Sequence, residues 1–192
     1  EVYRNNGAGS FTPIGAGLRN ARSSAAAWGD YDNDGDLDIL LSGASPASAA
    51  DSMIFRNDRS RFVPLATNLT RVSSAAAAWG DYDKDGDLDI LLTGFDGNNA
   101  PATRLYQNTS GNFSAVSTAL ANVGAGAAAW GDYDSDGDLD IALTGRGIGN
   151  ARLAKIYRNI GTAFEDLNAS ALAGVEGGSA AWGDYDNDGD LD

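Results

Sequence analysis

The sequence repeats itself about every 51 residues. The segment AWGDYDNDGDLD, residues 27–38, recurs three more times with few changes. Its tryptophans, Trp28, Trp79, Trp130 and Trp182, are spaced 51, 51 and 52 residues apart. Such a period is typical of arrays in which each repeat is one supersecondary unit that completes its core against its neighbours. The repeat therefore limits the fold more than any other feature of the chain.

Each period contains four short apolar segments separated by Gly, Asn and Ser. In one period they are residues 24–28, residues 37–41, residues 54–57 and a segment around Phe62. Segments of this length bounded by turn-forming residues indicate strands. The alanine runs are too short to form a stable helix, since isolated helices of fewer than about 12 residues are marginal. We predict an all-β fold, a β-propeller of four-stranded blades. An open β-solenoid is the alternative, although its rungs are usually shorter.

The small alanine side chains favour an innermost position for the first strand of each blade. The predicted organisation is a partial blade at 1–20, repeats at 21–71, 72–122 and 123–174, and a partial blade at 175–192. The first partial blade should supply a third and a fourth strand. The last should supply a first strand and an Asp-rich loop. We therefore expect the chain to form part of a larger propeller or of an oligomeric one.

The net charge of −14 is concentrated in the repeats. Twenty of the 27 acidic residues are aspartates of the four Asp-rich segments, and the other seven are outnumbered by 13 Lys and Arg. The basic residues are scattered, which argues against nucleic-acid binding. The chain has no Cys and no His, so thiolate chemistry, zinc sites and Ser-His pairs are excluded. No apolar run approaches 18 residues, so no membrane-spanning helix is expected.

We call the four Asp-rich segments loops 1 to 4: residues 30–38, 81–89, 132–140 and 184–192. Aspartates occupy positions 1, 3, 5, 7 and 9 of each loop, and Gly occupies position 6, where it permits a positive-φ turn. Positions 1, 3, 5 and 9 should offer carboxylates, and position 7 its backbone carbonyl. Oxygen ligands alone favour Ca²⁺ over zinc or copper, and Mg²⁺ keeps its waters. We predict about one Ca²⁺ per repeat. The candidate metal-binding residues are Asp30, Asp32, Asp34, Asp36, Asp38, Asp81, Asp83, Asp85, Asp87, Asp89, Asp132, Asp134, Asp136, Asp138, Asp140, Asp184, Asp186, Asp188, Asp190 and Asp192.

Three other interpretations of the loops are weaker. In a metal-free acidic turn, two carboxylates 4 Å apart would repel by about 4 kcal/mol at an effective dielectric constant of ~20, against a domain stability of ~5–15 kcal/mol. An EF-hand needs Glu at position 12, where this chain has Leu41, Leu92 and Leu143. A glycosidase acid–base pair would require every identical copy to be an active site. The constant Leu at position 8 is expected to pack the loop onto its blade.

The repeats resemble the FG-GAP repeats of integrin α-subunit propellers and the related VCBS-type repeats. Trp28-Gly29 stands where that family has Phe-Gly, an Asp-x-Asp-x-Asp-Gly-x-x-Asp loop follows, and residues 40–45 stand where its Gly-Ala-Pro strand end would be. The resemblance implies a propeller with calcium in hairpin loops between the first and second strands of its blades. It also implies extracellular adhesion or recognition, with lectin-like sugar binding in some members.

The expected function is an extracellular or cell-surface module, rigidified by calcium, with a structural, adhesive or protein-recognition role. The alternative is a carbohydrate-binding propeller whose pockets use Tyr3, Phe55, Tyr106 and Tyr157, although packing between blades is the favoured interpretation of these aromatics. A catalytic role is not expected, because no unique polar constellation is present. The ligand is a protein or a glycan, and copies could self-associate to complete or stack propellers. Four Asn-x-Ser/Thr sequons occur, at Asn68, Asn108, Asn112 and Asn168.

Overall fold

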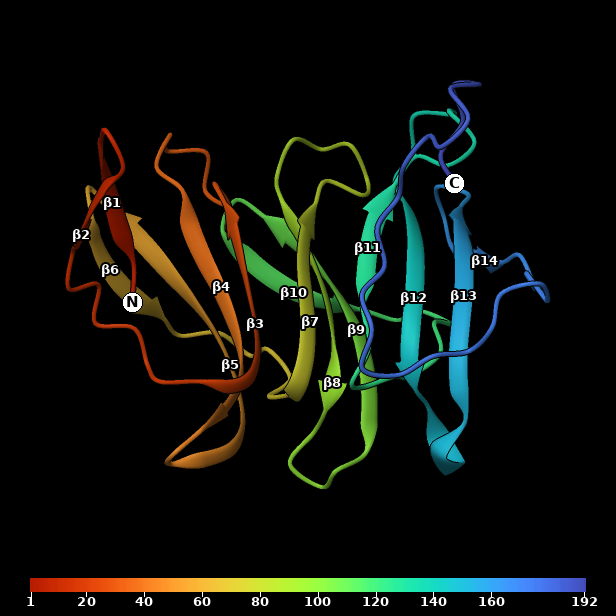
Figure 1. Ribbon diagram of the computed structural model, residues 1–192, viewed down its shortest axis with the longest axis horizontal. Helices are drawn as coiled ribbons and strands as arrows, with labels where there is room; N and C mark the ends of the chain where they lie inside the picture. The colour runs from red at the N-terminus through yellow and green to blue at the C-terminus, as the bar shows by residue number, and fades with distance from the viewer.

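The computed structural model describes residues 1–192 and is an all-β structure. It contains four antiparallel sheets, and its only helix is a single 3-10 turn, η1 (Ile148–Asn150) (Figure 1). The strands are β1 (Tyr3–Gly7), β2 (Ser10–Pro13), β3 (Arg22–Gly29), β4 (Asp38–Ser45), β5 (Ser48–Asp58), β6 (Arg61–Leu65), β7 (Ser73–Gly80), β8 (Asp89–Phe95), β9 (Pro101–Thr109), β10 (Asn112–Val116), β11 (Ala128–Gly131), β12 (Asp140–Arg146), β13 (Arg152–Asn159) and β14 (Phe164–Asp166).

Strands that are consecutive in the chain are neighbours in every sheet. The three large sheets have the orders β3-β4-β5-β6, β7-β8-β9-β10 and β11-β12-β13-β14, and β1 and β2 form a separate hairpin. Each large sheet lies within one predicted repeat, and its strands match the four apolar segments of the period. The predicted third and fourth strands of residues 1–20 are the β1–β2 hairpin.

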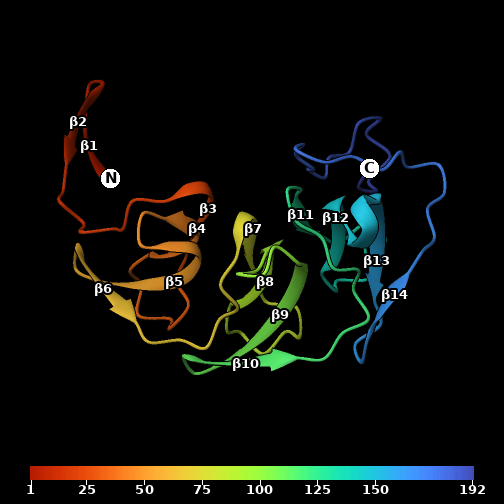
Figure 2. The same cartoon turned by 90° about the horizontal axis from the view of Figure 1, so that it is seen from below.

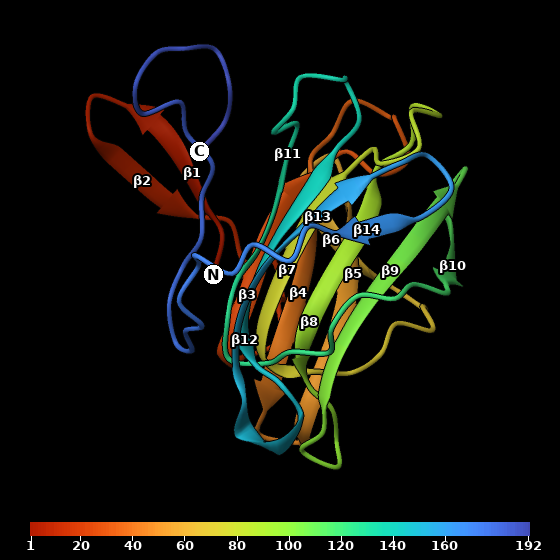
Figure 3. The same ribbon diagram turned by 90° about the vertical axis from the view of Figure 1, so that its right-hand side faces the viewer.

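The three large sheets are arranged side by side in an open arc. Their first strands, β3, β7 and β11, lie along the concave side of the arc, and their fourth strands lie along the convex side (Figure 2). A main-chain hydrogen bond of 2.9 Å joins Ala125, just before β11, to Ser74 of β7. Alanine is suited to this side because its small side chain lets neighbouring sheets approach closely. The β1–β2 hairpin projects away from the large sheets (Figure 3). The C-terminal segment contacts the third large sheet, where Nε1 of Trp182 donates to the carbonyl oxygen of Ala129 at 3.4 Å.

The hydrophobic core lies between the sheets. Leu40 and Ile54 of the first large sheet meet Ile90 and Tyr106 of the second in one buried cluster. Leu91 of the second sheet belongs to another cluster, which is otherwise built from the third sheet and the segment before it. Each sheet thus completes its core against its neighbours, as expected of a repeat protein.

The C-terminal segment differs from the prediction. Residues 175–192 were expected to form a first strand, but they contain no strand. A strand is defined by hydrogen bonds to a partner, and Trp182 has no second strand beside it comparable to β4 beside Trp28. Separately, no helix in the structure has the length and apolar character needed to cross a bilayer.

Candidate metal centre

The first three Asp loops connect the first strand to the second strand of a large sheet. Loop 1 joins β3 to β4, loop 2 joins β7 to β8, and loop 3 joins β11 to β12. All of them lie at the same end of the array, and the C-terminal segment carries loop 4 to that end as well (Figure 1). Strands flank the first three loops, so the rejection of an EF-hand is confirmed.

The aspartate at position 1 organises its loop. Asp30 accepts hydrogen bonds from the backbone N–H of Asp34 at 3.1 Å and from that of Gly35 at 3.0 Å, one on each carboxylate oxygen. Gly35 has φ 91° and Asn33 has φ 57°, so the chain reverses direction here through left-handed conformations that Gly and Asn adopt readily. The loop is therefore curled around its first carboxylate by its own residues.

Carboxylate oxygens converge inside each curled loop. In every loop, three aspartates each place one oxygen within 4.8 Å of the others. Positions 1 and 3 belong to all four clusters, joined by position 9 in loops 1 and 4 and by position 5 in loops 2 and 3. The clusters are Asp30, Asp32 and Asp38; Asp81, Asp83 and Asp85; Asp132, Asp134 and Asp136; and Asp184, Asp186 and Asp192. Such oxygen-only clusters could hold a metal ion and are compatible with calcium.

Buried oxygens without a partner provide a test of this fit. Oδ1 of Asp32, Oδ1 of Asp83 and Oδ1 of Asp132 are inaccessible to solvent and accept no hydrogen bond. An unsatisfied buried carboxylate oxygen is costly. The other oxygen of Asp83 accepts from Nε2 of Gln107 at 2.5 Å, which holds the carboxylate in place. A positive partner inside the loop would satisfy these atoms, so the residues present fit a hard cation.

In loops 1 to 3 the aspartate at position 9 is fully buried and links the loop to the second and third strands of its sheet. Asp38 begins β4, accepts from the N–H of Tyr31 at 3.2 Å, and accepts from the N–H of Asn57 in β5 at 2.7 Å. Asp89 and Asp140 make the same pair of bonds. Burial raises the pKa of Asp38 to about 6 and that of Asp89 to about 7, because it disfavours the charged form. Position 9 thus fixes the loop to the sheet.

The side chain at position 7 lies outside the carboxylate cluster. Asp36 accepts from the N–H of Arg59 at 3.2 Å, and Asp87 accepts from the N–H of Ser110 at 2.7 Å. These partners lie in the turn between the third and fourth strands of the same sheet. Among the residues predicted at position 7, namely Asp36, Asp87, Asp138 and Asp190, none belongs to the clusters. The side chains of Asp36 and Asp87 anchor their loops, and the predicted metal-binding role of position 7 rests on its backbone carbonyl.

The leucine at position 8 packs differently from the expectation. A Cβ atom on Gly29 would lie 3.0 Å from Cδ1 of Leu88, so the Leu88 side chain lies against the preceding sheet rather than only its own. Leu37 has no preceding large sheet to pack against and is 55% exposed. The residue is therefore a contact between repeats.

The sequence alone did not reveal an aromatic stack between neighbouring sheets. Tyr31 in loop 1 stacks on Trp79 of the next sheet, with ring centroids 6.2 Å apart and an interplanar angle of 10°. Tyr82 stacks on Trp130 in the same way, at 6.4 Å and 7°. Gly29 makes room, because a Cβ there would lie 2.7 Å from the Trp79 ring. The constant Tyr at position 2 and the constant Trp-Gly pair were the available signal.

The aromatics of the carbohydrate alternative are mostly core residues. Phe55, Tyr106 and Tyr157 are at most 3% exposed, while Tyr3 is 57% exposed. The Tyr106 hydroxyl donates to the hydroxyl of Thr70 at 2.9 Å. Packing between the sheets was the favoured interpretation, and it is confirmed for Tyr106 and Tyr157, each of which belongs to a cluster that spans two sheets.

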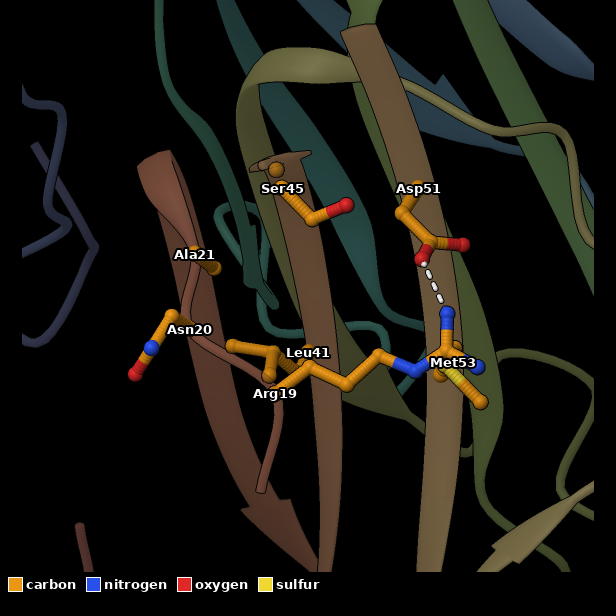
Figure 4. A pocket seen from close by; sticks show the side chains of 8 residues that line it. Arg19, Asn20, Ala21, Leu41, Ser45, Asp51 and Met53 are labelled. Atoms are coloured by element: carbon orange, nitrogen blue, oxygen red, sulfur yellow. Dashed lines mark hydrogen bonds and ion pairs between the residues drawn. The ribbon is translucent and has the colours of Figure 1, made fainter. Parts of the chain in front are cut away.

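A small cavity lies at the opposite end of the first large sheet from loop 1. Its volume is about 10 Å³, and Figure 4 shows Arg19 reaching across it to Asp51, with Nη1 and Oδ2 3.0 Å apart. A cavity of this size holds about one water molecule. It offers no space for a larger ligand.

These features define a class of protein: an all-β repeat protein with one Asp loop per repeat. A family model for the FG-GAP-like repeat matches residues 1–41 and 81–143, which together are more than half of the chain. The chain therefore belongs to the FG-GAP-like repeat family. No curated protein matches it.

Proposed function

We propose that the chain is a calcium-stabilised β-propeller module with a structural, adhesive or protein-recognition role outside the cell. One observation carries the proposal. In each of the first three repeats, carboxylates converge inside the loop, and one of them has a buried oxygen without a hydrogen-bond partner. At the same place, the position 9 aspartate binds the loop to the third strand of its sheet. A cation there would link the loop and the sheet.

The residues of the loop have separate tasks in this proposal. Calcium, when bound, supplies the positive charge that offsets the repulsion among carboxylates. Asp30 shapes the loop through its two backbone hydrogen bonds, Asp32 presents an unpartnered oxygen, and Asp38 ties the loop to β5. At calcium concentrations about 100 times Kd, each site would add about 2.7 kcal/mol to the free energy of unfolding. Four sites would supply much of a typical domain's stability.

The sheet arrangement supports the propeller. Four-stranded antiparallel sheets succeed one another with their first strands on the concave side of an arc (Figure 2). Continuing that arc with further sheets of the same kind would close a ring, as in propellers. We propose that such a ring forms, within one polypeptide or between copies.

An extracellular location suits the proposed sites, because extracellular calcium modules work at calcium concentrations of ~10⁻⁴–10⁻³ M. A binding role rather than a catalytic one is proposed because the four loops have nearly the same sequence and similar internal hydrogen bonds. No observation favours a sugar pocket over a protein-binding surface. A glycan array probed at millimolar calcium would separate those two ligand classes.

Thermal unfolding with and without calcium tests the proposal. We expect the Tm to fall steeply, by more than 10 °C, when a chelator removes calcium, because the emptied loops would lose about 10 kcal/mol of linked binding energy at saturating calcium. Restoring calcium should restore the Tm, while an equal ionic strength of NaCl should not. A Tm that does not change with excess chelator would refute the proposal.

A further inference from the structure

The asparagine near the end of the third strand lies between two Asp loops. Asn108 in β9 is fully buried, and its Nδ2 donates to the carbonyl oxygen of Tyr31 in loop 1 at 2.8 Å and to that of Leu88 in loop 2 at 3.1 Å. Its main-chain N–H donates to Oδ1 of Asp89, position 9 of loop 2, at 2.8 Å. One side chain and its own backbone therefore contact both loops.

The same link recurs one sheet further along. Nδ2 of Asn159 in β13 donates to the carbonyl oxygen of Tyr82 in loop 2 at 2.9 Å, and its N–H donates to Asp140 of loop 3 at 2.8 Å. In both places the asparagine and the tyrosine are 77 residues apart in sequence. The recurrence shows that the link belongs to the repeat.

A second contact joins neighbouring loops independently. Nδ2 of Asn33, position 4 of loop 1, donates to Oδ1 of Asp87 in loop 2 at 2.9 Å. At the next junction, Nζ of Lys84 lies 2.6 Å from Oδ1 of Asp138. The variable position 4 of one loop thus binds the position 7 carboxylate of the next. Loops 1, 2 and 3 form a connected series.

We infer that neighbouring loops bind their cations cooperatively, with Asn108 and Asn159 as positioning residues between them; this inference rests on the proposed function. In a loop without a cation, the carboxylates repel one another, so the loop holds its tyrosine carbonyl less firmly. A loop closed around a cation presents that carbonyl to the asparagine. The same asparagine then holds the position 9 aspartate of the next loop. Such coupling between two sites is reciprocal.

The first large sheet provides a matched control. Asn57 of β5 donates to the Leu37 carbonyl at 3.0 Å and to Asp38 at 2.7 Å, as Asn108 does within its own sheet, but it contacts no preceding loop. Asn57→Ser and Asn108→Ser therefore remove the same bond within a sheet. Only Asn108→Ser also removes the bond between loops.

A second pair of variants tests the same inference if Asn108→Ser does not fold. Asn33 is exposed and has φ 57°, which Gly adopts freely, so Asn33→Gly removes the contact with Asp87 at little cost to the loop. Asn187, at the same position of loop 4, has φ 60° and makes no contact with another loop. Asn187→Gly is therefore its control.

The experiment is a calcium titration of the whole chain by isothermal calorimetry, with circular dichroism to establish folding. We expect a Hill coefficient above 1, which Asn108→Ser and Asn33→Gly lower toward 1 while weakening calcium binding about two- to tenfold. Asn57→Ser and Asn187→Gly should keep the Hill coefficient of the original chain.

A Hill coefficient of 1 in the original chain would overturn the inference while leaving calcium binding intact. Equal losses of cooperativity in each variant and its control would also overturn it. If Asn108→Ser does not fold, the comparison of Asn33→Gly with Asn187→Gly decides the question. A complete absence of calcium binding would instead refute the proposed function.

Discussion

Loops 2 and 4 share the same pattern of internal hydrogen bonds. In loop 2 the carboxylate of Asp81 accepts backbone hydrogen bonds from positions 5 and 6, both at 3.1 Å, and Asp184 of loop 4 does the same at 3.2 and 3.1 Å. In each loop the tyrosine N–H donates to the position 9 aspartate, at 3.1 and 3.2 Å. Loop 4 adopts this structure although residues 175–192 contain no strand.

The surroundings of the two loops differ. Asp89 of loop 2 is fully buried and also bound by Asn108, whereas Asp192 of loop 4 is exposed. Tyr82 stacks on the next tryptophan, whereas Tyr185 is 80% exposed. The loop residues therefore determine the curl of the loop, and the neighbouring sheets determine its anchoring. Variants at matched positions of the two loops test this division.

The largest difference is expected at position 9. Asp89→Ala should lower the free energy of unfolding in calcium by about 3–5 kcal/mol, because two backbone N–H groups lose an ionised acceptor. Asp192→Ala lies in an exposed loop but removes a member of the loop 4 cluster, so its cost should not exceed about 2.7 kcal/mol, the contribution of one calcium site. Urea unfolding measures both values. Equal costs would show that anchoring does not distinguish the loops.

A smaller difference is expected at the glycine before each loop. A Cβ on Gly80 would lie 2.8 Å from the Trp130 ring, so Gly80→Ala should destabilise the protein by about 1–3 kcal/mol through overpacking. No atom lies within 4 Å of a Cβ on Gly183. Gly183→Ala should change the stability by less than about 0.5 kcal/mol. Urea unfolding measures both changes in stability. Equal changes for Gly80→Ala and Gly183→Ala would contradict the proposed difference between the two loops.

The smallest expected effect is the pH dependence of the Tm. Because burial raises the folded-state pKa of Asp89 from 3.8 to about 7, the calcium-free folded protein binds a proton between these values that the unfolded chain does not. In chelator, the Tm should therefore rise as the pH falls from 8 to 5.5. Calcium needs the ionised carboxylate, so the Tm gain from calcium should shrink over the same range. Scanning calorimetry measures both trends, and Asp89→Asn should weaken the pH dependence of the Tm in chelator. A Tm in chelator that falls on acidification would contradict this prediction.

The sequence predicted the elements that one repeat contains. The apolar segments gave the four strands, and the alternating aspartates gave a curled acidic loop between the first and second strands. These features depend on residues close together in the chain. Burial of Asp38 and its bond to Asn57 were not predictable in the same way, because they depend on the third strand of the folded sheet.

The hydrogen bonds and the ion pair between repeats escaped the prediction for a physical reason. Periodicity identifies residues that recur but not the residues that they face, and Asn108 lies 77 residues from its partner Tyr31. Position 4 varies among the loops, yet Asn33 and Lys84 both contact the next loop. Different side chains with a hydrogen-bond donor serve the same contact. The constancy of Asn at the third strand end was the unused signal.

Counting bound calcium tests the central claim most directly. Native mass spectrometry of the whole chain in micromolar to millimolar calcium should show up to four ions per chain. Replacing Asp81 and Asp83 together by Asn should remove one ion, because both belong to the loop 2 cluster. A chain that binds no calcium, or a double variant that keeps every ion, would contradict the account.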